Sequence, residues 1–282
     1  MRWTPGDRSN IEDRRGMSGV GVGGMGLGGL LLLLLLSWFT GVDLLSLFGG
    51  VGGPAPTESV GTTGSGKIAT SPEEERMVDM VDAVMDDAQE TWAQILGGRY
   101  QRTTAVLFRD AIQSACGFAQ AATGPFYCPA DRKVYLDLGF FSELHRKLGA
   151  PGDFAQAYVL AHELGHHVQT ILGVESQVRR QQAADASARN ELSVRMELQA
   201  DCFAGVWGSH ANKAPGGVDL DPGDVDEGLR AAAAIGDDRL QRMQGGRVAP
   251  ERFTHGTSEQ RAQWLRRGLE SGDPNSCDTF SR

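Results

Sequence analysis

The sequence lacks the surplus of basic residues that proteins use to bind nucleic acids. Its 27 lysines and arginines are outnumbered by 36 aspartates and glutamates, and the net charge at pH 7 is −9. It also has no lysine- or arginine-rich run of the kind that contacts polyanions. Because binding to a phosphate backbone depends on a basic surface, we expect no nucleic-acid partner.

The sequence also lacks a CxxC pair, which argues against a thiolate zinc ribbon and against a thioredoxin-like redox motif. An even number of cysteines is typical of disulfides in an oxidising compartment. The four cysteines allow three connectivities, and the spacing does not choose among them. Cys116 and Cys128 flank a turn-rich loop and could form a disulfide across it, which would leave Cys202 to pair with Cys277.

Charged side chains are absent from residues 16–42, a stretch that contains an unbroken leucine run at 30–36. About 20 apolar residues span a bilayer as a helix, so we expect one transmembrane anchor over residues 16–48. A cleaved signal peptide is the alternative. The uncharged stretch is longer than the apolar core of a usual signal peptide, and no clear A-x-A site follows it, which favours the uncleaved anchor.

Four arginines precede this stretch, with Arg14 and Arg15 next to it and Arg2 and Arg8 further out. The flank that follows it begins with acidic residues. The positive-inside rule therefore predicts a single-pass protein of the cell membrane, with residues 1–15 in the cytoplasm and the remainder outside the cytoplasm. The disulfide interpretation agrees with that orientation.

The anchor is rich in glycine. Two small-xxx-small pairs, Gly19/Gly23 and Gly24/Gly28, could pack two such helices together, so self-association through the anchor is one hypothesis. Residues 49–71, rich in Gly, Pro, Ser and Thr, are typical of a flexible linker.

Residues 72–282 are expected to form one domain of the α+β class, mostly helical with a small sheet. Ser71 and Pro72, followed by three glutamates, indicate the start of a helix that reaches about residue 96. The polar stretch 175–190 is compatible with a helix or with a partly mobile loop. Apolar spacing predicts strands over 103–108 and 133–138, and helices over 140–148, 154–172, 191–210, 225–243 and 258–270.

The helix over 154–172 contains the sequence His-Glu-Leu-Gly-His at positions 162–166. Positions i and i+4 of a helix lie one above the other, so His162 and His166 can bind one metal ion. A catalytic Zn²⁺ has three protein ligands and keeps one position open for water. Glu163 is rotated by about 100° from His162; it cannot easily bind the same ion, but it can act as general base on the water.

The third ligand must come from another segment, and we favour Glu197. Asp201 follows it by one helical turn and could accept a hydrogen bond from the far nitrogen of a ligand histidine. Gly165 is expected to let the helix of Glu197 approach closely. The alternative is a buried polar cluster without metal, which would require full mutual pairing of two histidines and two acids. Zinc is therefore the favoured interpretation.

Other polar residues are expected to have lesser roles. His167 points away from the metal, either behind the ligands or at the surface, His145 is expected to be exposed, and His210 lies near a helix end. Arg261 could anchor an acid near the site or belong to a solvated helix face. Asp237-Asp238 is more typical of turn chemistry than of a calcium site.

Four segments of the chain resemble the neutral zinc metallopeptidase family of bacterial membrane-anchored proteins. The layout is also similar to the gluzincins, and the resemblance implies a zincin-like fold with Zn²⁺ as cofactor. In gluzincins a T-H-P element lies near the end of the domain. Thr254-His255-Gly256 stands in that place with Gly instead of Pro, which implies a catalytic role for His255. The matching segments are AYVLAHELGHHVQ (157–169), GPFYCPAD (124–131), ELQADC (197–202) and FTHGTSEQR (253–261).

Together these residues predict a membrane-anchored zinc endopeptidase acting on a peptide or protein substrate. Glu163 would take the proton of a zinc-activated water, and zinc with a donor such as His255 would stabilise the oxyanion. The strand over 133–138 could form the rim along which substrate adds as an extra strand, or it could be an ordinary strand within the sheet. Two alternatives remain: a non-catalytic membrane-tethered scaffold with structural zinc, and a zinc hydrolase acting on a non-peptide amide.

Overall fold

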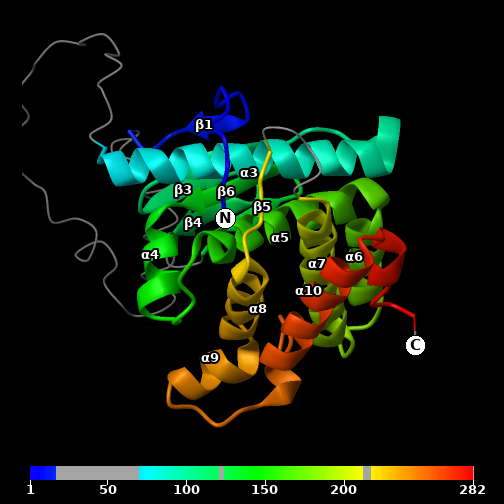
Figure 1. The fold of residues 1–282 in the computed structure, drawn as a ribbon. Coiled ribbons are helices and arrows are strands. Elements are labelled where there is room, and N and C mark those ends of the chain that lie inside the picture. The colour runs from blue at the N-terminus through cyan, green and yellow to red at the C-terminus, as the bar shows by residue number, and fades with distance from the viewer. Residues whose placement is uncertain (17–69, 121–123, 212–216, 282) are drawn as a thin grey trace, which may run out of the picture. The chain divides into compact units, whose positions relative to one another are not determined.

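The computed structural model describes residues 1–16, 70–120, 124–211 and 217–281 (Figure 1). Within these ranges helices predominate over a small sheet, which confirms the predicted α+β class. The anchor and linker predicted for residues 16–71 fall almost entirely outside the described residues. Among the helices that are described, none combines the length and the apolar character needed to cross a bilayer.

The main sheet has four strands in the order β1–β2–β6–β5. β2 (Thr104–Phe108) and β6 (Lys133–Asp137) run parallel at its centre, and β5 (Phe126–Cys128) pairs antiparallel with β6 at one edge. Of the two interpretations of residues 133–138, the ordinary sheet strand is the one that the structure shows and the substrate rim is wrong, because β6 has a neighbour on each side. The edge strand next to it is β5.

The other edge strand, β1 (Ile11–Asp13), was not predicted. It pairs in parallel with β2, with Glu12 opposite Val106. We expected residues 1–15 to be a segment separate from the domain, but they complete the hydrogen bonding of β2 and fold in the same compact unit as residues 70–282. The domain boundary at residue 15 is thus corrected, whereas the side of the membrane on which each part lies stays a prediction.

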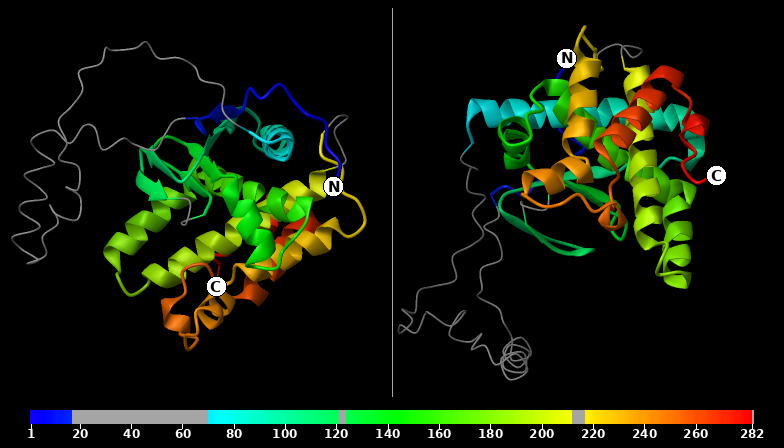
Figure 2. Two further views of the ribbon diagram at one scale, coloured as in Figure 1. Left: turned by 90° about the vertical axis from the view of Figure 1, so that its left-hand side faces the viewer. Right: turned by 90° about the horizontal axis from the view of Figure 1, so that it is seen from below.

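The core lies on both faces of this sheet. Leu107 of β2 and Leu136 of β6 pack with apolar residues of the helices α3 (Pro72–Leu96) and α5 (Asp153–Leu172). On the opposite face Val106, Phe108 and Tyr135 form a smaller cluster. In Figure 2 (left) the strands lie toward the top and the helices α8 to α10 toward the bottom, with α5 between them. The sheet thus supports one long side of α5.

The described helices largely follow the predictions. Ser71 caps the first of them, because its hydroxyl accepts the backbone N–H of Glu74. The stretch 175–190, for which the sequence allowed either a helix or a partly mobile loop, is mostly helical. The helices and the remaining strands are α3 (Pro72–Leu96), β3 (Ala111–Ser114), β4 (Gly117–Gln120), α4 (Gly139–Arg146), α5 (Asp153–Leu172), α6 (Val174–Ala184), α7 (Arg189–His210), α8 (Asp224–Ala234), α9 (Asp237–Met243) and α10 (Ser258–Ser271).

One predicted helix is wrong in its extent. The helix expected over 225–243 is two helices, α8 and α9, separated at Ile235-Gly236. Gly236 is extended, with φ −70° and ψ 141°, and a Cβ on it would lie 2.2 Å from the backbone nitrogen of Ser258. The first residue of α10 thus passes directly against the backbone of Gly236, and a helical period read from the sequence contains no sign of that contact.

Both favoured disulfides are present, Cys116–Cys128 and Cys202–Cys277. The first joins the residue before β4 to the end of β5. The second ties the C-terminal tail to α7, the helix that also carries Glu197. Each bond therefore constrains an element next to the predicted site.

Candidate active site

α5 carries the two histidines of the motif through the middle of the domain. Its first half is apolar and belongs to the main core, with Phe154, Tyr158 and Ala161 buried. His162 and Glu163 follow with only 6% and 7% of their surface exposed. The motif is therefore held on a rigid, packed helix rather than on a loop, which fixes the positions of its side chains.

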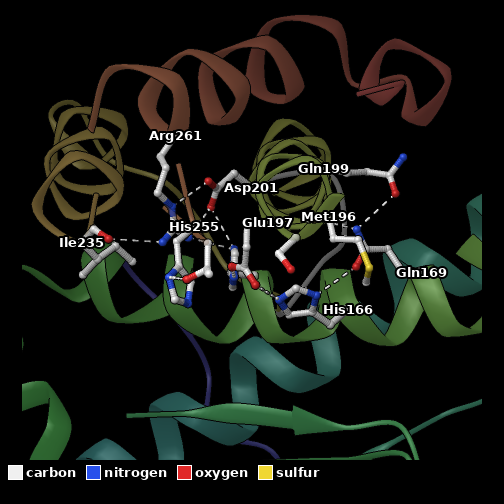
Figure 3. A network of polar contacts seen from close by, with 12 residues as sticks. His166, Gln169, Met196, Glu197, Gln199, Asp201, Ile235, His255 and Arg261 are labelled. Carbon is white, nitrogen blue, oxygen red and sulfur yellow. Dashed lines mark hydrogen bonds and ion pairs between the residues drawn. The ribbon is translucent and has the colours of Figure 1, made fainter. Parts of the chain in front are cut away.

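Glu197 of α7 meets both histidines. Its Oε2 lies 3.1 Å from Nε2 of His162, and its Oε1 lies 3.5 Å from Nε2 of His166. The ligand atoms of the three residues lie within 4.8 Å of one another (Figure 3). A Cβ on Gly165 would come within 2.9 Å of the carbonyl oxygen of Ala200, so the expected close approach of the two helices is present and requires glycine.

Asp201 lies behind His162 and is fully buried. It accepts a hydrogen bond from Nδ1 of His162 at 2.8 Å, as the spacing predicted, and another from the hydroxyl of Tyr158 at 2.5 Å. Arg261 of α10 donates to both carboxylate oxygens at 2.9 Å each. Of the two interpretations of Arg261, the anchor for an acid is the one that the structure shows. The sequence analysis assigned no role to Tyr158, although this residue stands one turn before His162.

His166 is oriented by an amide that the sequence analysis missed. The Oε1 of Gln169 lies 2.9 Å from Nδ1 of His166. The same amide donates to the carbonyl of Met196 at 2.7 Å and to Gln199 at 3.1 Å, which fixes its oxygen toward the histidine. Nδ1 must then be the donor, as it is in His162. With Nδ1 of each ring held by an acceptor, Nε2 of both imidazoles faces Glu197, and this is the nitrogen that binds a metal once it has lost its proton.

The charges of the site favour a cation. Burial lowers the pKa of His162, but the carboxylates of Asp201 and Glu197 outweigh burial and raise it to about 10. Burial raises the pKa of Glu197, and the neighbouring histidines and Arg261 outweigh it and hold that pKa well below its ordinary range. Two ionised carboxylates thus face Arg261 and a protonated His162, and a bound metal cation would take the place of the proton on Nε2 of His162. Two imidazole nitrogens and one carboxylate are also a donor set that Zn²⁺ takes in catalytic sites, so the residues fit this ion.

A cavity of about 600 Å³ opens over these side chains. Glu163 lines it together with His162, His166 and Glu197, so it shares the cavity into which a metal-bound water would open. β5 contributes one wall, and the region of α8 and α9 contributes another. Lining residues include Phe126, Tyr127, Phe140, Val159, Arg179, Ile235, Leu240 and His255.

His255 reaches the cavity from the loop before α10, and half of its side chain is exposed. Its Nδ1 lies 3.2 Å from Oδ1 of Asp237. The second oxygen of Asp237 accepts the backbone N–H groups of Thr254 and His255 at 2.7 Å and of Gly256 at 3.1 Å. The contact with Asp237 raises the pKa of His255. Asp237 therefore holds the loop as well as the imidazole, a role that its turn-like context did not reveal.

The remaining histidines lie away from the ligand atoms. His167 is fully buried, so the surface alternative for it is wrong; its nitrogens contact the Tyr127 hydroxyl at 3.0 Å and the Gln101 carbonyl at 2.6 Å. Burial lowers its pKa. His145 is exposed and His210 is the last residue of α7, as expected.

A helix-borne histidine pair, a carboxylate from a neighbouring helix and a glutamate beside them define the class of metal-dependent hydrolases with an HExxH motif. The chain belongs to the family described as "Putative neutral zinc metallopeptidase", whose model matches residues 1–280. Membership of this family implies Zn²⁺ as the cofactor, in agreement with the donor set.

Relatives of similar length carry names without a function. The "Uncharacterized protein YpfJ" of Escherichia coli (strain K12) is 47% identical over 296 residues, which cover 100% of this chain and 99% of that protein. The "Uncharacterized protein Rv2575" of Mycobacterium tuberculosis (strain ATCC 25618 / H37Rv) is 44% identical over 209 residues, 71% of this chain and 70% of the relative. No solved structure matches the chain.

Proposed function

We propose that this chain is a zinc-dependent endopeptidase in which His162, His166 and Glu197 hold the metal and Glu163 is the general base. One observation carries the proposal. Three ligand-type atoms converge within 4.8 Å, and Glu163 lines the same cavity. A structural zinc site would close all four positions with protein ligands, whereas this arrangement supplies three.

When bound, Zn²⁺ supplies a Lewis acid that polarises a carbonyl and acidifies water. Glu163 takes a proton from the attacking water and passes it to the leaving amine. His255, held by Asp237, donates a hydrogen bond to the oxyanion that develops on the substrate. Asp201 keeps the Nε2 of His162 directed at the metal position, because it accepts the proton on the opposite ring nitrogen.

The substrate in this proposal is an extended peptide lying along β5. The outer edge of β5 has no partner strand among the described residues, and its residues Phe126 and Tyr127 line the cavity. Backbone hydrogen bonds to a free strand edge bind peptides with little dependence on sequence. The apolar side chains of Ile235 and Leu240, which also line the cavity, favour an apolar substrate side chain beside them.

Attachment to the cell membrane through residues 16–48, with the catalytic domain outside the cytoplasm, forms part of the proposal. The two disulfides support it, because such bonds persist in oxidising compartments and are rare in the cytosol. Self-association through the glycine pairs of that segment also stays a prediction, since those residues lie outside the described ranges.

The test uses the purified full-length protein, Glu163→Gln and a matched control, Glu175→Gln. Glu175 also lines the cavity but lies on α6, which carries none of the three ligand residues. Zinc content is measured by mass spectrometry, and turnover by digestion of a peptide library. We expect Glu163→Gln to keep wild-type zinc and to lose about 10²–10⁴-fold in turnover, the usual contribution of a general base. Glu175→Gln should retain turnover within a few-fold.

Three other outcomes would change the proposal. Undiminished cleavage by Glu163→Gln would refute the assignment of the base. Full zinc content without cleavage of any peptide by the wild type would favour the non-catalytic scaffold. Release of amine from a non-peptide amide, with peptides left intact, would instead identify the alternative hydrolase.

A further inference from the structure

The segment that precedes the uncharged stretch is built into the domain. β1 lies beside α3 at the edge of the sheet (Figure 1). Hydrogen bonds extend the pairing at both ends, since Ala105 donates to the carbonyl of Asn10 at 2.8 Å and Arg14 donates to the carbonyl of Leu107 at 2.8 Å. Residues on both sides of the predicted anchor thus share one sheet.

A buried polar contact depends on this docking. Gln89 of α3 is fully buried, and its amide donates to Oδ1 of Asn10 at 3.0 Å while its oxygen accepts the N–H of Thr103 at 2.6 Å. Asn10 itself is only 7% exposed. Buried amides without partners are costly, so removal of the N-terminal segment would leave Gln89 with an unsatisfied donor. Asn10 is therefore part of the buried hydrogen bonding of the domain.

Arg15 connects the segment before the predicted anchor with the start of α3, which follows the predicted linker. This side chain is buried, and it pairs with Asp13 at 2.6 Å and with Glu74 and Glu75 at 3.0 Å each. Both glutamates lie in the first turn of α3, directly after the predicted linker. We refer to Arg8, Asn10 and Arg15, together with their contacts on α3, as the N-terminal seam.

The arginines on which the predicted membrane orientation depends are paired with acidic residues. Arg8 pairs with Glu75 at 2.7 Å and with Asp79 at 2.5 Å. Arg14 pairs with Glu12, and Arg2 contacts Asp221 of the loop before α8 at 3.0 Å. Each of these charges has an acidic partner within the folded domain. Their position before an uncharged stretch is therefore no independent sign of a cytoplasmic N-terminus.

From these contacts we infer that residues 1–15 and the catalytic domain lie on the same side of the membrane. A single crossing would separate them by a hydrocarbon core of about 30 Å, and β1 could then not pair with β2. The single crossing predicted for residues 16–48 is therefore incompatible with the pairing of β1 and β2. The inference revises the orientation predicted from charge and does not depend on the activity of the site.

Cysteine labelling in bacterial membranes tests the inference. All four native cysteines are in disulfides, so a single added cysteine reports its own position. The variants are Thr4→Cys and, as a second N-terminal position, Ser9→Cys, with Ser142→Cys on α4 for the domain; all three residues are exposed. Each full-length variant is treated with a membrane-impermeant maleimide in intact spheroplasts and again after permeabilisation.

We expect the N-terminal cysteines and Ser142→Cys to label to the same extent in intact spheroplasts, with less than a twofold gain on permeabilisation. Joint labelling only after permeabilisation would also support the shared side and would place it inside the cell. Labelling of Ser142→Cys before permeabilisation and of both N-terminal cysteines only afterwards would overturn the inference. The unsubstituted chain and a cytosolic protein with a free thiol report background and leakage.

Discussion

The candidate site and the N-terminal seam both join distant segments through charged side chains, but they differ in access to water. At the site, Asp201 is fully buried and Arg261 is 2% exposed. At the seam, Arg15 is buried, whereas its partners Glu74 and Glu75 keep 19% and 34% of their side chains exposed. Water can replace a lost partner at the seam but not at the site. Equivalent substitutions should therefore cost more at the site.

The largest effect on stability is expected for Arg261→Met. This change leaves the carboxylate of Asp201 buried without a compensating charge, and breaking such a pair costs about 3–5 kcal/mol of unfolding free energy. Urea unfolding of the full-length protein, followed by the fluorescence of the buried Trp92 and Trp207, measures the loss. Excess chelator in every sample removes the contribution of zinc binding.

Arg266→Met is the matched control, because Arg266 lies on the same helix and is exposed. Its effect should stay within about 0.5 kcal/mol, as for most surface substitutions. If the two variants were equally stable, the buried pair would contribute no more than a surface charge, and the contrast between site and seam would fail.

A smaller effect on stability, with a specific effect on zinc, is expected for Gly165→Ala. Alanine gains up to about 1 kcal/mol in helix propensity, but its Cβ would meet the backbone of Ala200 at 2.9–3.0 Å. Overpacking of this kind costs about 1–3 kcal/mol, so the contact should win. Because α5 and α7 must separate, Glu197 should move from the histidines and zinc affinity should fall about 10-fold or more, like the loss of an orienting contact.

Isothermal titration of the metal-free protein measures that affinity. Gly98→Ala is the control, since a Cβ on Gly98 would meet nothing within 4 Å. Unchanged zinc affinity in Gly165→Ala, together with unchanged affinity in the control, would show that the distance between the two helices does not set the site.

Much of the site could be predicted because its geometry is local to two helices. The spacing of four between His162 and His166, and again between Glu197 and Asp201, places each pair on one helix face. Arg261 was different. It is 60 positions from Asp201, and helical periodicity says nothing about which distant acid an arginine will meet. Contacts between elements therefore had to come from the fold.

The seam escaped prediction for the same reason. β1 has only three residues, Ile-Glu-Asp, too few for an alternating pattern to indicate a strand. Its flanking arginines fitted a rule for membrane orientation, and the acids that pair with Arg15 from α3 stand 59 and 60 positions away. Charged residues close together in a sequence are solvated and unpaired only when no oppositely charged residue from a distant segment reaches them. The sequence alone does not show whether such a residue, like Glu74 or Glu75 here, is close in space.

The smallest effect is expected at the seam, and it should depend on pH. Arg15→Ala removes charged hydrogen bonds to partly exposed partners, which should lower the unfolding free energy by about 1–2 kcal/mol at pH 7. Arg14→Ala is the control, because Arg14 pairs with Glu12 of its own segment and should matter by a few tenths of a kcal/mol, like other surface pairs. Urea unfolding at a series of pH values measures both.

The sign of the pH dependence follows from the two glutamates. The contact with Arg8 is the main cause that lowers the pKa of Glu75; for Glu74, burial raises the pKa, but Arg109 and Arg15 outweigh it and lower it. A carboxyl group with a lowered pKa stabilises the fold above its unfolded pKa of about 4.3, and that stability is lost as the pH falls through the folded pKa. Wild type and Arg15→Ala should therefore differ at pH 7 and converge toward pH 3. A constant difference over this range would mean that Arg15 acts through the packing of its apolar stem, and the seam would then resemble an ordinary core contact more than a set of ion pairs.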